Sequence, residues 1–131
     1  MAYQSALFVE YVKYDRASQG ELLNYTQESL SVIDSIVDEF RYEKRILGDH
    51  EHMLISAYVF ETARARFGGE YGRAEGDAHD VVDPYFLLIC AGASCVRYAP
   101  MSAILLRTVS QRQASISTLY ERTRERVMAR T

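Results

Sequence analysis

The segment that most constrains how this chain can fold is an apolar helix that ends at two consecutive glycines. Residues 50–67 are predicted to be helical, and their apolar side chains point in every direction around the axis, which is typical of a helix packed at the centre of a domain. Asp49 is the predicted N-cap. Gly68 and Gly69 follow the helix, and glycine accepts backbone conformations that other residues resist. The chain is therefore predicted to leave a buried helix through a sharp reversal and to enter a short strand at 70–74.

Two further helices are predicted before this one. Residues 2–17 place tyrosines and Leu7 at helical spacing, although the stretch 7–12 is also rich in strand-forming residues, so a strand is the alternative there. Thr26 is the predicted N-cap of the next helix, and Gly48 is predicted to end it. The buried face of that helix is one apolar stripe with charged residues opposite, and it consists of Leu30, Ile33, Ile36, Val37 and Phe40.

The following part of the chain predicts a small antiparallel sheet. Residues 85–90 form a continuous apolar run, which favours a strand buried on both faces. Gly92 is placed at the first central position of a type II′ hairpin turn, and residues 95–99 return as the partner strand. Gly72 lies inside the short strand 70–74 and predicts a bulge or an edge position there. We therefore expect a three-stranded meander.

Residues 101–129 are predicted to form a long C-terminal helix, either continuous or broken near the polar stretch 110–117. Apolar residues recur along it at helical spacing, and they are Leu105, Val109, Ile116, Leu119 and Val127. Helices and strands that do not alternate along a chain argue for an α+β fold and against a parallel α/β sheet. We expect residues 1–131 to form a single α+β domain with three N-terminal helices, the meander and the C-terminal helix.

The cysteine and hydropathy patterns bear on the compartment. No apolar run reaches the roughly 18 residues of a membrane helix, and the N-terminus lacks the features of a secretory signal peptide, so we predict no membrane contact and a cytoplasmic location. If Gly92 and Ala93 form the hairpin turn, Cys90 lies directly opposite Cys95, near enough to oxidise. A redox switch is one interpretation, but two reduced and small core residues are favoured.

Charge is unevenly distributed along the chain, whose net charge is −3. Residues 97–131 hold seven arginines against two glutamates, which gives +5, whereas residues 1–96 hold eight basic and sixteen acidic side chains, which gives −8. A basic C-terminal segment can bind nucleic acid. Because the overall acidic balance repels phosphate at long range, we do not expect nucleic acid as a partner and favour a helix face that attracts an acidic protein surface.

Two histidine-containing runs resemble metal sites but do not predict one. His50 and His52 lie two positions apart on a helix and point in nearly opposite directions, so they cannot share an ion. His79 lies in an acidic loop whose carboxylates lack the offsets of a calcium-binding loop. No metal or cofactor is therefore expected.

Glu61 and Arg64 form the one charged constellation on the apolar helix. They lie one helical turn apart on the same side, so they can pair. A structural ion pair is the favoured interpretation, and a general-acid pair or a substrate clamp is the alternative. Catalysis needs a carboxylate with a perturbed pKa in a cleft, and the sequence contains no nucleophile elbow, phosphate-binding loop or nucleotide fingerprint.

The helix that ends at the glycine pair also carries a motif with the pattern Y-x-G-E-x-x-R-R-x-x-G-G-x-W. The matching positions are Tyr58, Glu61, Arg64, Gly68, Gly69 and Tyr71, with Phe60 at the first glycine and Tyr71 at the tryptophan. Residues 23–34 match a preceding segment, L-D-Y-S-x-E-S-L-x-x-V-D. On these motifs the chain, over about residues 22–107, resembles a family of small uncharacterised bacterial proteins, a domain of unknown function. The resemblance implies an α+β fold and no known reaction.

These observations favour binding over catalysis. The chain contains ten tyrosines, and tyrosine and arginine are enriched in protein interfaces. We expect a small cytoplasmic accessory protein, immunity-like or chaperone-like at most, that acts through a protein partner or through self-association of its C-terminal helix. The alternative is a small-molecule or catalytic site, for which the candidate lining residues are Tyr58, Glu61, Arg64 and Tyr71.

Overall fold

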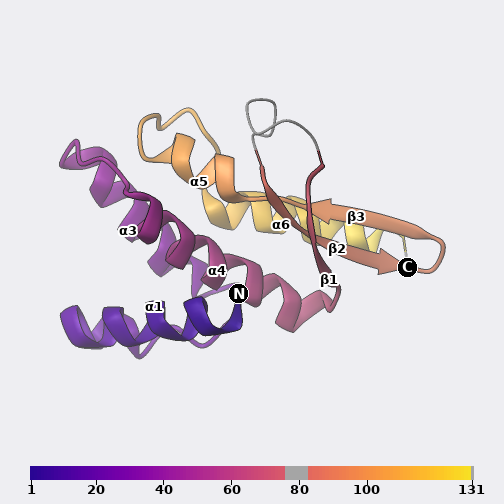
Figure 1. Ribbon diagram of the computed structural model, residues 1–131, viewed down its shortest axis with the longest axis horizontal. Helices are drawn as coiled ribbons and strands as arrows, with labels where there is room; N and C mark the ends of the chain where they lie inside the picture. Colours follow the sequence, from indigo (N-terminus) through magenta and orange to yellow (C-terminus); the bar gives the residue numbers. More distant parts are fainter. Residues whose placement is uncertain (76–82, 131) are drawn as a thin grey trace.

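Helices and a small antiparallel sheet confirm the α+β fold class (Figure 1). Four helices and not the predicted three precede the sheet, because residues 17–20, where the first helix was expected to stop, form a short helix of their own. The computed structural model describes residues 1–75 and 83–130, so the predicted acidic loop around His79 lies outside the described residues. The elements are α1 (Ala2–Asp15), α2 (Ala17–Gly20), α3 (Leu30–Tyr42), α4 (Asp49–Phe67), β1 (Glu70–Arg73), β2 (Tyr85–Ala91), β3 (Ser94–Tyr98), α5 (Met101–Arg107) and α6 (Ile116–Met128).

The central helix is α4, as its apolar pattern predicts. Tyr58, Val59 and Phe60 are completely buried, although they are consecutive and so point in different directions. The N-terminal residues that could have formed a strand are helical, and the resulting α1 packs along α4 (Figure 1). The Phe8 ring of α1 lies 5.6 Å from the Tyr58 ring. On other sides α4 contacts α5 and β2, so it is covered from several directions.

The C-terminal end of α3 differs from the prediction, because the helix stops before Gly48. Lys44 adopts a left-handed backbone conformation with φ of 53°. Its N–H donates to the carbonyl oxygen of Arg41 over 3.2 Å, and the Arg45 N–H donates to that of Phe40 over 2.9 Å. These two bonds form a Schellman motif. Lys44 therefore takes the terminating role that was predicted for glycine.

The predicted N-caps differ as well. Thr26 Oγ1 accepts the Ser29 N–H over 3.3 Å. Thr26 therefore begins a turn that precedes α3, and the helix itself starts later, at Leu30. Asp49 is the first residue of α4 and does not cap it, since Gly48 occupies the N-cap position. The Asp49 carboxylate still lies in the first turn, where the helix dipole favours negative charge.

The three strands form an antiparallel sheet in the order β1-β2-β3, which is the predicted meander. Gly72 lies in β1 at the edge of the sheet, one of the two placements expected for it. The prediction that the second strand is buried on both faces is wrong. Leu87 and Ile89 are buried, whereas Leu88 and Cys90 are exposed. The elements that contact β2 from outside the sheet, α4 and α6, leave its other face open.

The hairpin between β2 and β3 has the predicted register. Ala91 pairs with Ser94 across a two-residue turn in which Gly92 has φ of 64°. Cys90 pairs with Cys95, and the two form a disulfide with an S–S distance of 1.99 Å. Both cysteines are exposed. The favoured interpretation of two reduced core residues is therefore wrong, because the cysteines face away from the helices.

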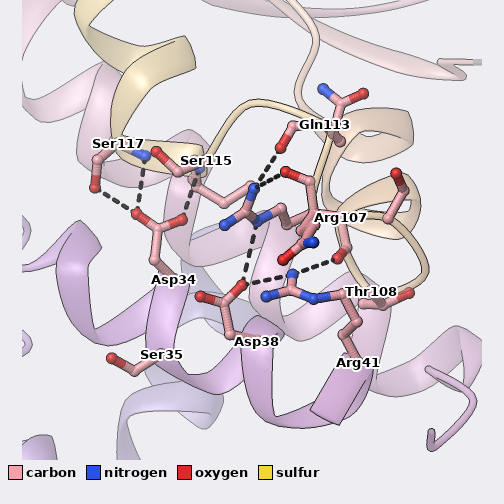
Figure 2. A network of polar contacts seen from close by, with 12 residues as sticks. Asp34, Ser35, Asp38, Arg41, Arg107, Thr108, Gln113, Ser115 and Ser117 are labelled. Carbon is pink, nitrogen blue, oxygen red and sulfur yellow. Dashed lines mark hydrogen bonds and ion pairs between the residues drawn. The ribbon is translucent and has the colours of Figure 1, made fainter.

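The predicted C-terminal helix is two helices, with the break in the polar region where one was considered. Residues 108–115 separate α5 from α6 and are held against α3 by a polar network (Figure 2). The Arg107 guanidinium donates to Asp38 Oδ1 over 3.2 Å and to the carbonyl oxygens of Gln111 and Gln113. Arg41 donates to Asp38 and to the Arg107 carbonyl. One arginine therefore anchors the connecting loop to the neighbouring helix.

Across residues 1–75 and 83–130, no helix combines the length and the apolar character needed to cross a lipid bilayer.

Candidate functional site

An open groove lies at the C-terminal end of α4, and we call it the Tyr25 groove. Its volume is about 580 Å³, and it is lined by Tyr25, Glu61, Arg64, Ala65, Gly68 and Gly69. The glycine pair forms part of its wall because Gly68 and Gly69 have φ values of 69° and 107° and turn the chain sharply from α4 into β1. This reversal brings Tyr71 of β1 back beside Glu61 of α4.

Glu61 is held by the sheet more closely than by its predicted arginine partner. The Tyr71 hydroxyl donates to Glu61 Oε2 over 2.5 Å, whereas the nearest Arg64 nitrogen lies 4.0 Å from the same oxygen. The Glu61 side chain is 13% exposed and the Arg64 side chain 52%. Burial, and then the adjacent Glu61 carboxylate, raise the pKa of Tyr71 far above its ordinary value. The tyrosine therefore keeps its proton at neutral pH, and Arg64 is the group that faces solvent.

Of the four predicted site residues, Glu61 and Arg64 line the groove, whereas Tyr71 and Tyr58 do not. Tyr58 is completely buried, and its hydroxyl lies 2.7 Å from Ser29 Oγ and accepts the Tyr25 N–H over 3.0 Å. Burial raises the pKa of the Tyr58 hydroxyl. Tyr58 therefore supports the groove from behind and does not line it.

The sequence does not predict Tyr25 as a residue of this groove. Its φ is 60°, a left-handed conformation that is uncommon for a bulky residue and costs on the order of 1–3 kcal/mol. Several contacts hold it there. Its hydroxyl accepts a hydrogen bond from Ser5 Oγ over 2.9 Å, and its ring stacks on Tyr58 with 4.9 Å between centroids. No local pattern in the sequence marks this conformation, because the contacts come from α1 and α4.

A second depression adjoins the first and shares Tyr25 and Ala65 with it. Its volume is about 430 Å³, and the remaining lining residues are Thr26, Gln27, Glu28, Arg66, Tyr120, Glu121 and Arg124. Glu121 accepts hydrogen bonds from Arg124 at 2.6 Å and from Gln27 at 2.5 Å. These bonds, the one from Arg124 first, lower the pKa of Glu121 to about 2. Two of the four charged side chains that line this depression, Glu121 and Arg124, are therefore paired with each other.

A third depression has a different character, and we call it the α3–α5 groove. Its volume is about 490 Å³, and it is lined by Arg41, Lys44, Arg45, Ile46, Leu47, Leu105, Thr108 and Val109. Three of its aliphatic side chains are exposed: Ile46 is 91% exposed, Val109 73% and Leu105 44%. The groove therefore presents apolar side chains to solvent beside a basic rim.

The apolar stripe predicted for self-association is divided by the break between α5 and α6. Ile116 and Val127 are buried in the core, and Leu119 is partly buried. Only Leu105 and Val109 are exposed, and both lie in the α3–α5 groove. A continuous C-terminal stripe is therefore not available to a partner.

The candidate metal ligands that the structure describes do not come together. His52 Nε2 lies 2.7 Å from the Met101 carbonyl oxygen. In the described ranges, no three histidine, cysteine, aspartate or glutamate side chains are grouped so that they could hold a metal ion.

Comparison with known proteins finds no matching family model, no matching curated protein and no matching solved structure. The resemblance of residues 58–71 to a bacterial family of unknown function therefore stays a prediction.

Proposed function

We propose that this chain is a small cytoplasmic binding protein that acts through protein–protein contacts, without catalysis, and that the α3–α5 groove is its docking surface. The observation that supports the proposal is the grouping of Ile46, Leu105 and Val109 in one depression while each is exposed. Exposed apolar groups that gather at one place mark sites of association, whereas single ones do not.

The charged residues at the rim of the α3–α5 groove favour a partner with an acidic residue. Arg41 is paired with Asp38 at 2.9 Å, and Arg45 with Glu43 at 2.7 Å. Lys44 is exposed and forms no ion pair within residues 1–75 and 83–130. Its left-handed backbone conformation fixes the turn in which the lysine sits. We therefore propose that the partner is an amphipathic segment of another protein, with apolar side chains for the groove and an acidic residue for Lys44.

The test compares the native chain with Val109→Asp, which places a charge in the groove, and with Tyr14→Asp as the matched control, since Tyr14 is 90% exposed on α1. A photo-cross-linker at position 109 identifies the partner segment in the host, and titration calorimetry then measures its affinity. We expect Val109→Asp to weaken binding by tenfold or more, which is about 1.4 kcal/mol, and Tyr14→Asp to leave it unchanged. Equal affinity of the native chain and Val109→Asp would exclude the groove.

Two further measurements separate the possible occupants. Lys44→Glu weakens binding of an acidic segment, and raising the salt concentration reduces the difference between the two proteins, because salt screens exposed charges. A second copy of this chain in the groove would instead appear as a dimer in light scattering that Val109→Asp converts to a monomer, and this result would contradict a heterologous partner.

The conformation of Tyr25 favours a second candidate function, a small-molecule site in the Tyr25 groove. Strained residues that are held by several contacts are frequent at ligand sites, and Arg64 offers an exposed guanidinium that can bind a carboxylate. The test is an NMR titration with small organic carboxylates. Shifts at Tyr25 and Gly69 that disappear in Arg64→Ala and persist in the control Arg122→Ala would support the site. The absence of any shift in this groove would rule these ligands out.

A further inference from the structure

The disulfide between Cys90 and Cys95 occupies an accessible position that none of the proposed binding surfaces uses. Both residues are exposed, and they lie on β2 and β3 next to the hairpin turn. Figure 1 shows this turn at one end of the molecule, on the side away from α1 and α3. A reagent in solution therefore reaches the bond without passing through the core.

The register of the hairpin brings the two sulfur atoms together whether or not they are bonded. Ala91 and Ser94 flank the two-residue turn, and Cys90 and Cys95 are the next pair, with a Cα–Cα distance of 4.0 Å. Directly opposed residues in the pair after a two-residue turn have their side chains on one face and close to each other. The backbone ladder therefore holds both thiols in position to form the bond again after it is broken.

The packing of the hairpin against the helices does not involve this bond. The opposite face of the hairpin carries Leu87, Ile89, Val96 and Tyr98, which are 0%, 2%, 1% and 4% exposed and belong to the core. These side chains fix the hairpin against the helices. The disulfide closes a loop with a sequence separation of only 5 residues, which the turn already closes. Reduction therefore breaks the disulfide on the open face of the hairpin and removes no contact from its packed face.

We propose that Cys90–Cys95 is a reversible thiol–disulfide exchange site for low-molecular-weight thiols. A small thiolate attacks one of the two protein sulfur atoms, the Cys90–Cys95 bond breaks, and the other cysteine leaves as a thiolate that takes up a proton. A second small thiolate attacks the small-molecule sulfur of the mixed disulfide. This step forms the small-molecule disulfide and releases the second cysteine thiolate, which is also protonated. The reverse sequence oxidises the dithiol, with the small-molecule disulfide as the oxidant.

The test equilibrates the folded, full-length chain in buffers with different ratios of reduced to oxidised glutathione, blocks free thiols with a maleimide, and measures the intact mass. We expect the population to pass from the disulfide to the dithiol within the accessible ratios, while circular dichroism and the midpoint of urea unfolding change little. Cys90→Ser and Cys95→Ser each retain one thiol, and each is expected to accumulate the mixed disulfide with glutathione.

A register control uses the double variant Ser94→Cys/Cys95→Ser, which keeps two cysteines but moves one to the opposite face of β3. This variant is expected to form mixed disulfides without closing the intramolecular bond. A native bond that is reduced only after urea unfolds the chain would overturn the proposal. So would a dithiol that oxidised glutathione leaves unpaired, or a register variant that closes as readily as the native pair.

Discussion

Asp34 of α3 caps the first turn of α6 through Ser117, whose backbone N–H and hydroxyl both donate to Asp34 Oδ2, over 3.2 and 2.6 Å (Figure 2). The other oxygen of Asp34 accepts the Ile116 N–H over 2.7 Å. The first N–H groups of a helix have no partner within it, and here a carboxylate from another helix supplies one. Ser115 completes the cap by accepting the Thr118 N–H over 3.1 Å. This capping arrangement fixes where α6 begins and ties it to α3.

Asp34→Ala is therefore expected to lower the free energy of unfolding by about 1–2 kcal/mol, because it removes a cap and leaves helix N–H groups without a partner. Urea denaturation followed by circular dichroism measures the change. The neighbouring Ser35→Ala is the control, because Ser35 is exposed and, among the residues that the structure describes, its hydroxyl donates only to the carbonyl of Ser31 within its own helix. Equal stability of the two variants would contradict the capping role.

Alanine substitutions at the two glycines after α4 are expected to lower the free energy of unfolding by different amounts. A Cβ at Gly69 would lie 2.6 Å from the Leu88 carbonyl oxygen, whereas a Cβ at Gly68 has no atom within 4 Å. Both residues have positive φ. Gly68→Ala is therefore expected to lower the free energy of unfolding by about 1 kcal/mol, because of the backbone conformation alone. Gly69→Ala is expected to lower it by about 3 kcal/mol or more, because the edge strand must also move. Thermal or urea unfolding of the pair measures the difference.

Two tyrosine-to-phenylalanine variants are expected to differ in their effect on stability, and only the first is expected to destabilise the fold. Tyr71→Phe removes the hydrogen bond to Glu61 and is expected to lower the free energy of unfolding by about 1–2 kcal/mol. The Tyr98 hydroxyl is buried and has no hydrogen-bond partner within the described residues. Tyr98→Phe is therefore expected to be neutral or stabilising, since it removes a buried polar group that makes no bond. Urea denaturation at neutral pH compares them, and destabilisation by Tyr98→Phe would indicate a partner for that hydroxyl.

The same tyrosines predict a loss of stability in alkali. Burial raises the pKa values of Tyr58, Tyr71, Tyr98 and Tyr120 above the ordinary value of 10.0. Above about pH 10 the unfolded chain releases these protons while the folded chain retains them, so the stability present below that pH falls as the pH rises. Urea denaturation at pH values on either side of 10 measures this slope, which Tyr98→Phe is expected to reduce. A stability that does not change across this range would contradict the burial of these hydroxyl groups.

The pKa of Glu121 tests whether its carboxylate is paired with Arg124 and Gln27 in the second depression beside Tyr25. Arg124 and then Gln27 lower this pKa to about 2. Any stability that depends on the charged carboxylate is therefore present above its ordinary pKa and lost only as the pH falls through about 2. We expect Arg124→Gln to raise the pKa of Glu121 strongly and Gln27→Ala to raise it less, as measured by NMR titration of the side-chain carboxyl carbon. An unchanged pKa in Arg124→Gln would show that the two side chains do not pair in solution.

Several features of the fold were predictable because they depend on residues close together in sequence. The all-round apolar pattern of residues 50–67 predicted the central position of α4, and the single glycine at position 92 predicted the hairpin turn and so the pairing of Cys90 with Cys95. Glu61 and Arg64 were expected to pair, and they do so weakly at 4.0 Å. In each case the backbone period or the conformational freedom of glycine is a local property.

Other features were not predictable, because distant residues decide them. The exposure of Cys90 and Leu88 depends on which face of the sheet α4 and α6 cover. The end of α3 lies at Lys44, a residue without the usual glycine signal, and the beginning of α6 depends on Asp34, which is 82 residues from Ile116. The strained conformation of Tyr25 requires Ser5 and Tyr58 to hold it.

The sequence by itself therefore determined the α+β order of the longer helices and the strands, the register of the hairpin and the central helix, but not the short α2, since periodicity and turn residues act over a few positions. The tertiary structure decided which charged groups are paired, which apolar residues of the C-terminal segment remain exposed, and where the grooves lie. Those properties arise where α3, α5 and α6 meet and where β1 returns to α4, and the contacts there join residues that no local pattern connects.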